Sequence, residues 1–144
     1  MAVEPIRHEF DVDCTPEQAF ALYTKRIGEW WPAEYSADPE TLRAVTIEGR
    51  VGGRVFATHA EDELTWGRIT AWEPGRELGH TFTLAQDAEQ PTDVSVRFAP
   101  SGDGCHVRFE HGGWDEGNLA DRAKFSDWPV ILDRFAELAN RKAG

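Results

Sequence analysis

The sequence has no long hydrophobic run and no leader-like start. None of its apolar stretches approaches the roughly 20 residues that a membrane-spanning helix requires. The first five residues carry neither a basic cluster nor an apolar stretch, so we expect no secretory signal. The 40% hydrophobic content argues against disorder, and 144 residues suffice for one core. We therefore expect a single soluble domain over residues 1–144, located in the cytoplasm.

Positive charge is also scarce. The chain carries 15 Lys and Arg side chains against 26 Asp and Glu side chains, for a formal net charge of -11. Its basic residues form no cluster along the sequence. A protein with this balance repels phosphate backbones and anionic lipid headgroups. We therefore expect neither a nucleic acid nor a membrane as partner.

Cysteines and the common catalytic motifs are largely missing as well. Cys14 and Cys105 are too few and too far apart for a disulfide framework or a zinc knuckle. There is no Gly-rich phosphate loop after a strand, no serine elbow and no HExxH helix. The acidic runs at residues 61–63 and 115–116 fall in expected loops and are interpreted as solvated surface charge. We expect no metal, no cofactor and no catalytic residue that the sequence can single out.

What the chain does contain is regular alternation of apolar and polar residues. Residues 6 to 12 alternate strictly, which predicts a half-buried first strand. Thr15, Pro16 and Gln18 then form a helix-start signal. Short alternating segments separated by turn residues, from about 42 to 111, indicate an antiparallel meander. Residues 128 to 142 carry an apolar stripe at helical spacing.

This order of elements predicts an α+β fold. We expect a curved antiparallel sheet of about six or seven strands wrapped around a long C-terminal helix, with two short helices after the first strand. The space between sheet and helix is either filled by side chains or a ligand cavity, and the sequence leaves both open.

Six motifs, in order, resemble those of a known family. They are Val51-Gly52-Gly53-Arg54, Trp66-Gly67-Arg68-Ile69, Trp72-Glu73-Pro74, Thr92-Asp93-Val94-Ser95-Val96-Arg97-Phe98, Glu110-His111-Gly112-Gly113-Trp114 and Trp128-Pro129-Val130-Ile131-Leu132. Over nearly the whole chain they resemble the heat-shock-protein ATPase activator-like family of the START-like (SRPBCC) superfamily. The resemblance implies the helix-grip fold and a deep cavity that, across the superfamily, holds lipids, sterols, polyketides or other apolar molecules. The Asn- and Trp-rich motif linked to chaperone activation is absent, so no chaperone role is implied.

The candidate ligand residues are mostly aromatic, because large apolar rings with a polar handle suit a cavity wall. The expected wall consists of Trp30, Trp31, Phe56, Trp66, Phe82, Phe109, His111 and Phe135. Arg54, Arg68 and His80 are candidate polar anchors, although the facing of the two arginines is ambiguous. For any single tryptophan, ordinary core packing is the alternative interpretation.

Strand parity places three histidines, His8, His80 and His111, on the apolar face of the sheet. If the first strand pairs with the last, we expect His8 opposite His111 and Cys14 opposite Cys105. A tight hairpin at residues 99 to 104 would then place His80 at the end of the sheet opposite His111. This arrangement argues against a three-histidine metal site.

The preferred function is binding or carriage of a small hydrophobic or aromatic molecule in the internal cavity. One alternative is an enzyme similar to the polyketide cyclases or aromatases of the superfamily, in which His80, His111 or Arg68 polarises a reactive chain. Another is a co-chaperone-like module that binds another protein, whose identity the sequence does not indicate.

Overall fold

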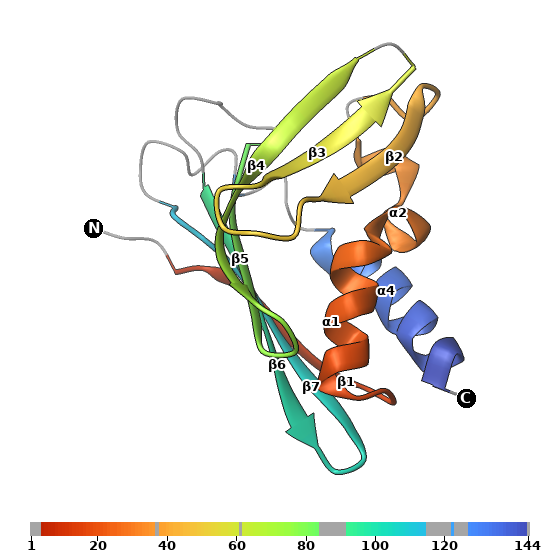
Figure 1. Cartoon of the computed structure of the whole chain (residues 1–144), viewed down its shortest axis with the longest axis vertical. Coiled ribbons are helices and arrows are strands. Elements are labelled where there is room, and N and C mark those ends of the chain that lie inside the picture. The colour runs from red at the N-terminus through yellow and green to blue at the C-terminus, as the bar shows by residue number, and fades with distance from the viewer. Residues whose placement is uncertain are drawn as a thin grey trace.

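The protein folds around one antiparallel sheet. The computed structural model describes residues 4–36, 38–60, 62–83, 92–114, 122 and 127–143. Its seven strands are ordered β1-β7-β6-β5-β4-β3-β2, and every neighbouring pair is antiparallel. They are β1 (Ile6–Val12), β2 (Leu42–Ile47), β3 (Arg54–His59), β4 (Glu63–Glu73), β5 (Glu77–Phe82), β6 (Thr92–Ser101) and β7 (Gly104–Gly112). The sheet curves strongly, as predicted (Figure 1).

The helices lie together against the concave side of this sheet (Figure 1). They are α1 (Pro16–Lys25), α2 (Ile27–Trp30), the 3-10 turn η1 (Ala33–Tyr35) and α4 (Trp128–Ala143). Helix α1 begins with a complete capping box, in which Thr15 and Gln18 each bond the backbone N–H of the other. Helix α4 contacts α1, α2 and β1. The predicted helix-grip architecture is therefore confirmed.

The core lies between the inner face of the sheet and α4. Alternate residues of β6 and β7, such as Val96 and Phe109, are buried, which confirms the alternation seen in the sequence. From α4, the buried residues recur at helical spacing and are Trp128, Ile131, Leu132, Phe135, Leu138 and Ala139. No helix in the described ranges is long and apolar enough to cross a membrane.

The predicted strand register is wrong by two residues. The hairpin between β6 and β7 closes with Ser101 opposite Gly104, and Gly102 adopts a positive φ of 58° in the two-residue loop. Each strand therefore runs closer to the turn than the alternation alone suggested. On the other side of β7, Val12 instead of Cys14 lies opposite Cys105.

This shift corrects the expected separation of the histidines. His8 lies opposite Phe109, and Ile6 takes the place opposite His111. Val94 is opposite His80 on one side and opposite His111 on the other. His80 and His111 therefore lie at the same level of the sheet instead of at opposite ends. Residue 61 and the acidic pair 115–116 lie outside the described residues.

Candidate functional site

The interior of the molecule contains a continuous set of packed aromatic rings, here called the aromatic cluster. Its members are Tyr23, Trp30, Trp31, Trp66, Phe82, Phe109, His111, Trp114, Trp128 and Phe135, all buried. Seven of the eight predicted wall residues are in this cluster, and Phe56 is the exception. The cluster joins α1, α2, β4, β5, β7 and α4.

Ring contacts run through the cluster from helix to sheet. Trp31 lies 4.9 Å from Trp66 and 5.9 Å from Trp128, measured between ring centroids. Phe82 lies 6.2 Å from Trp66 and 5.5 Å from His111. Most of these pairs are edge-on or tilted, the arrangements that aromatic rings prefer. The short segment after α1 therefore places Trp31 between the sheet and α4.

His111 forms the polar centre of the cluster. The indole nitrogen of Trp128 can only donate, and it donates to Nδ1 of His111 at 3.1 Å. Nε2 therefore carries the imidazole proton and donates to Oγ1 of Thr92 at 2.6 Å. The Thr92 hydroxyl in turn donates to the carbonyl oxygen of Phe82 at 3.2 Å. Burial, followed by the neighbouring His80, lowers the pKa of His111 to about 3, so this ring is neutral at pH 7.

His80, a predicted anchor, lies beside the cluster in a fixed tautomer. Its Nδ1 lies 2.7 Å from the carbonyl oxygen of Thr81, which can only accept, so Nδ1 carries the proton. Nε2 therefore presents a lone pair. The ring centroid is 5.8 Å from that of Phe82, and burial lowers the pKa of His80 to about 4. At pH 7 His80 and His111 are therefore hydrogen-bonding groups without charge.

The lowered pKa of His80 predicts a pH dependence of stability. In the unfolded chain this histidine titrates near its ordinary pKa of about 6.5. Between pH 6.5 and 4 the unfolded state therefore binds a proton that the folded state does not, so lowering the pH favours unfolding. We expect the free energy of unfolding of the wild type to fall by about 1.4 kcal/mol per pH unit more than that of His80→Gln. Urea titrations across this range measure both slopes, and parallel slopes would contradict the prediction.

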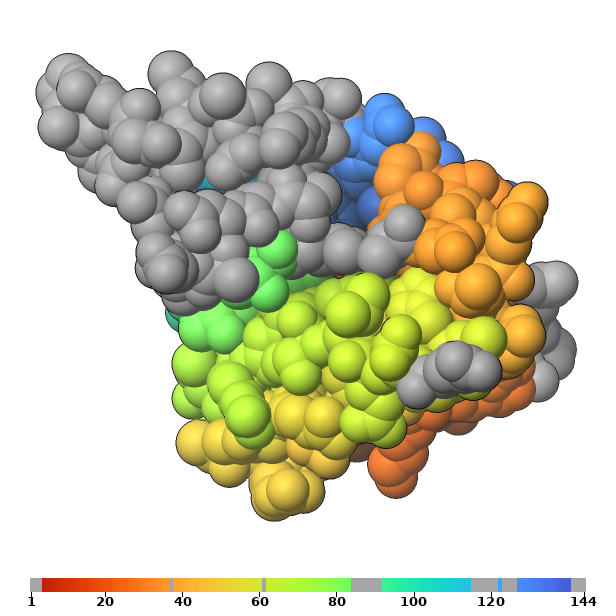
Figure 2. Space-filling view, turned by 90° about the horizontal axis from the view of Figure 1, so that it is seen from above, coloured from red at the N-terminus to blue at the C-terminus, as the bar shows by residue number. Residues whose placement is uncertain are grey.

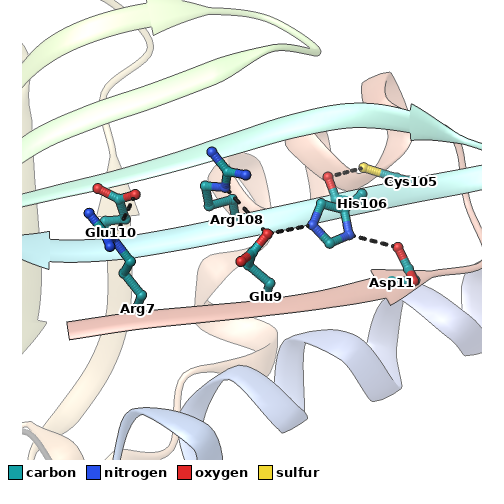
Figure 3. Close-up of polar contacts among 7 residues, drawn as sticks. All are labelled: Arg7, Glu9, Asp11, Cys105, His106, Arg108 and Glu110. Carbon is teal, nitrogen blue, oxygen red and sulfur yellow. Dashed lines mark hydrogen bonds and ion pairs between the residues drawn. The ribbon is translucent and has the colours of Figure 1, made fainter. Parts of the chain in front are cut away.

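The outer face of β1 and β7 carries ionisable side chains that bond one another (Figure 3). His106 donates from Nδ1 to Asp11 and from Nε2 to Glu9, each at 2.9 Å. Because both nitrogens face carboxylates, the doubly protonated ring fits best, and these bonds raise the pKa of His106. Arg108 also contacts Glu9, at 3.3 Å. Strand β7 thus carries a histidine with a raised pKa on its outer face and one with a lowered pKa on its inner face.

Three predicted site residues lie away from the cluster. Phe56 alternates with the core residues Val55 and Ala57, so its side chain lies on the outer face of β3. There the Arg54 guanidinium carbon is 4.1 Å from the Phe56 ring centroid. Arg68 lies opposite Arg54, is exposed, and donates to the carbonyl oxygen of Gly52 at 3.4 Å.

Sequence reasoning missed four members of the site. Tyr23 packs 4.8 Å from Trp30, and burial raises the pKa of its hydroxyl well above the ordinary value. Trp114 and Trp128 were not among the predicted wall residues, although both are buried in the cluster. Thr92 could have been found from its inward parity with Val94, Val96 and Phe98, but its hydrogen bond to His111 could not.

Two further features complete the description of possible sites. A mostly apolar groove of about 330 Å³ runs along α1 and is lined by Cys14, Gln18, Ala21, Leu22, Lys25 and Arg26. Arg26 at its end is paired with Glu29.

Both thiols, Cys14 and Cys105, are buried and free. Within the described ranges, no three His, Cys, Asp or Glu side chains gather in a metal-binding arrangement.

Comparison with known proteins places this fold and sequence in a defined group. The profile of the family described as "Activator of Hsp90 ATPase homolog 1-like protein" matches residues 13–140. An uncharacterized protein of Mycobacterium tuberculosis, strain H37Rv, is 28% identical over 141 residues, which cover 89% of this chain and 93% of the relative.

Among solved structures, the Aha1 dimer from Colwellia psychrerythraea superposes with a TM-score of 0.72 at 18% identity, covering 99% of this chain and 100% of that one. A second neighbour is Txn09, described as an anthrahydroquino-gamma-pyrone synthase complexed with SUM. It has a TM-score of 0.63 at 25% identity and covers 95% of this chain and 97% of its own.

Proposed function

This chain belongs to the Activator of Hsp90 ATPase homolog 1-like family, and from that premise we propose that it binds a small aromatic molecule between its sheet and α4. The observation that carries the proposal is the aromatic cluster. Small-molecule sites are mostly apolar and aromatic, with a few fixed polar groups that orient the ligand. Here His80 provides such a group, because its neutral ring has a defined tautomer with the lone pair on Nε2.

The end of the sheet near Leu64 is the proposed entrance. Leu64 lies opposite the core residue Ala57 and is therefore on the inner face, yet its exposed fraction is 42%. Trp66, two residues further along β4, is already fully inside the cluster. Figure 2 shows this end of the molecule, where β4 (yellow-green) lies beside the segment with α2 and η1 (orange). A ligand entering there would meet Trp31 and Trp66 first.

A thermal-shift screen with recorded tryptophan emission tests this proposal. We expect neutral polycyclic aromatics and flavonoids to stabilise the protein, by about 2.7 kcal/mol at 100 times the dissociation constant, whereas fatty acids and sterols have a smaller effect. The emission should change as well, because the cluster contains buried tryptophans.

The variant Ala21→Glu is the matched control. It places a carboxylate in the groove along α1 without touching the aromatic cluster, so binding in the interior should persist. Loss of binding in this variant would show that the ligand binds in the groove along α1 and not in the interior. No stabilisation across the panel would reject the proposal and favour the protein-binding alternative.

The placement of the two histidines favours a cyclase-like enzyme as the second candidate function. His80 and His111 flank Val94 at the same level of the sheet, and the lone pair on Nε2 of His80 could accept a proton or orient a hydroxyl. The similarity to Txn09 supports this candidate. If it holds, His80→Gln should retain ligand affinity and lose turnover of a polyketide-like substrate. Equal turnover in both proteins would exclude this role for His80.

A further inference from the structure

The indole N–H groups of the buried tryptophans differ in whether they have a hydrogen-bond acceptor. Four of them donate to a protein acceptor. Trp30 donates to the carbonyl of Leu22, Trp31 to that of Tyr35, Trp114 to that of His111, and Trp128 to the imidazole of His111. Trp66 is the fifth, and its Nε1 is buried without a hydrogen-bond partner in the part of the chain that the structure describes.

An unpartnered donor of this kind is rare and needs an explanation. The exposed fraction of Trp66 is 2%, so bulk water does not reach its nitrogen. His59 Nε2 is the other buried side-chain nitrogen without a partner among the described residues. Its ring can change tautomer, because Nδ1 lies 2.9 Å from the Thr41 hydroxyl, which both donates and accepts. An indole has no such freedom, so Trp66 always presents an N–H.

We propose that the Trp66 N–H is the hydrogen-bond anchor for a neutral aromatic ligand that carries a carbonyl oxygen. This inference rests on the proposed function and names the ligand class of the same site. Trp66 lies between the rings of Trp31 and Phe82, so a ligand that reaches its nitrogen is surrounded by aromatic faces.

The electrostatics of the interior favour a neutral ligand over a carboxylate. The histidines in and beside the aromatic cluster, His111 and His80, have lowered pKa values and carry no charge at pH 7. The candidate cations Arg54 and Arg68 belong to the outer face of β3 and β4. A buried carboxylate would therefore lose its hydration without gaining a counter-charge from these residues. A carbonyl accepts one hydrogen bond at a far smaller desolvation cost.

Two ligands that differ by one carbonyl group test the anchor. 9-Fluorenone carries a carbonyl where fluorene has a methylene, on the same three-ring skeleton. We expect the wild-type protein to bind 9-fluorenone about tenfold more tightly, measured by quenching of tryptophan emission. In Trp66→Phe the two affinities should become equal within about twofold, because the donor is gone. Trp72→Phe is the matched control and should keep the tenfold ratio, since Trp72 packs against Phe20 at 5.0 Å and is outside the aromatic cluster.

The wild-type protein alone can decide the question if Trp66→Phe does not fold. The indole ¹H–¹⁵N signal of Trp66 should move downfield with 9-fluorenone and not with fluorene. If fluorene binds as tightly as 9-fluorenone and this signal does not move, the anchor is refuted while the binding function stands. If neither compound binds, the anchor is refuted, and the thermal-shift panel decides separately whether the binding function stands.

Discussion

His111→Ala should lower the free energy of unfolding by about 3–5 kcal/mol. The substitution removes a fully buried ring and leaves a cavity in the centre of the aromatic cluster. It also takes the acceptor from the Trp128 indole and the donor from the Thr92 hydroxyl. These groups tie the start of α4 to β6, so several elements lose their connection at once. Urea denaturation followed by tryptophan emission measures the loss.

His106→Ala provides the matched control on the same strand. This ring lies on the outer face of β7, is partly exposed, and bonds only surface carboxylates. Exposed ion pairs contribute little, so the free energy of unfolding should change by at most about 1 kcal/mol. If the two variants have the same urea midpoint, His111 is not the structural centre that its hydrogen bonds indicate.

Most of the fold could be predicted because it follows from local pattern. The alternation of residues 6 to 12 gave β1, and Thr15, Pro16 and Gln18 gave the start of α1. The apolar stripe of the last helix identified the side that packs on the sheet. The resemblance then supplied the family. Each of these signals concerns residues close in sequence or a periodicity, which a single chain displays directly.

The strand register could not be predicted because alternation alone does not fix which residues pair across neighbouring strands. The alternation of apolar residues is unchanged when a strand slides by two positions, so it fixes the face but not the pairing. The two-residue loop at Gly102 sets the register of β6 against β7, and the separate pairing of β1 with β7 places His8 opposite Phe109 instead of His111. The same slide brought His80 level with His111, which decides where the polar groups of the site lie.

The candidate site could be predicted only as a set of large aromatic residues. Their types indicated burial, and parity indicated the inner face, which is why seven of the eight wall residues lie in the cluster. Phe56 is aromatic like the cluster residues, but it alternates with the inward-facing Val55 and therefore lies on the outer face of β3. Which indole nitrogen lacks a partner depends on contacts between α2, β4 and α4, and no sequence pattern reports it.

Gly67→Ala should be among the most damaging single substitutions in the chain. A Cβ atom at this position would lie 1.8 Å from the carbonyl oxygen of Thr81 and 2.5 Å from its carbonyl carbon. Both are backbone atoms of β5, so no side-chain rotation relieves the clash and the two strands must separate. The hydrogen bond from the Thr83 N–H to the Trp66 carbonyl, 2.7 Å long, lies beside this point and would be strained. We expect a loss of about 3 kcal/mol or more in the free energy of unfolding.

The consequence extends to the binding site, because Gly67 follows Trp66 in the bulge of β4. Close approach of β4 to β5 at the glycine keeps the Trp66 ring 6.2 Å from Phe82 inside the cluster. Gly28→Ala is the control, since its added Cβ would meet only ordinary contacts at 3.6 Å and should change the free energy of unfolding by less than about 1 kcal/mol. Urea denaturation of both variants, together with the near-ultraviolet circular dichroism of the tryptophans, measures the effect. A stable Gly67→Ala protein with a native tryptophan spectrum would show that β4 and β5 can separate without disturbing the aromatic cluster.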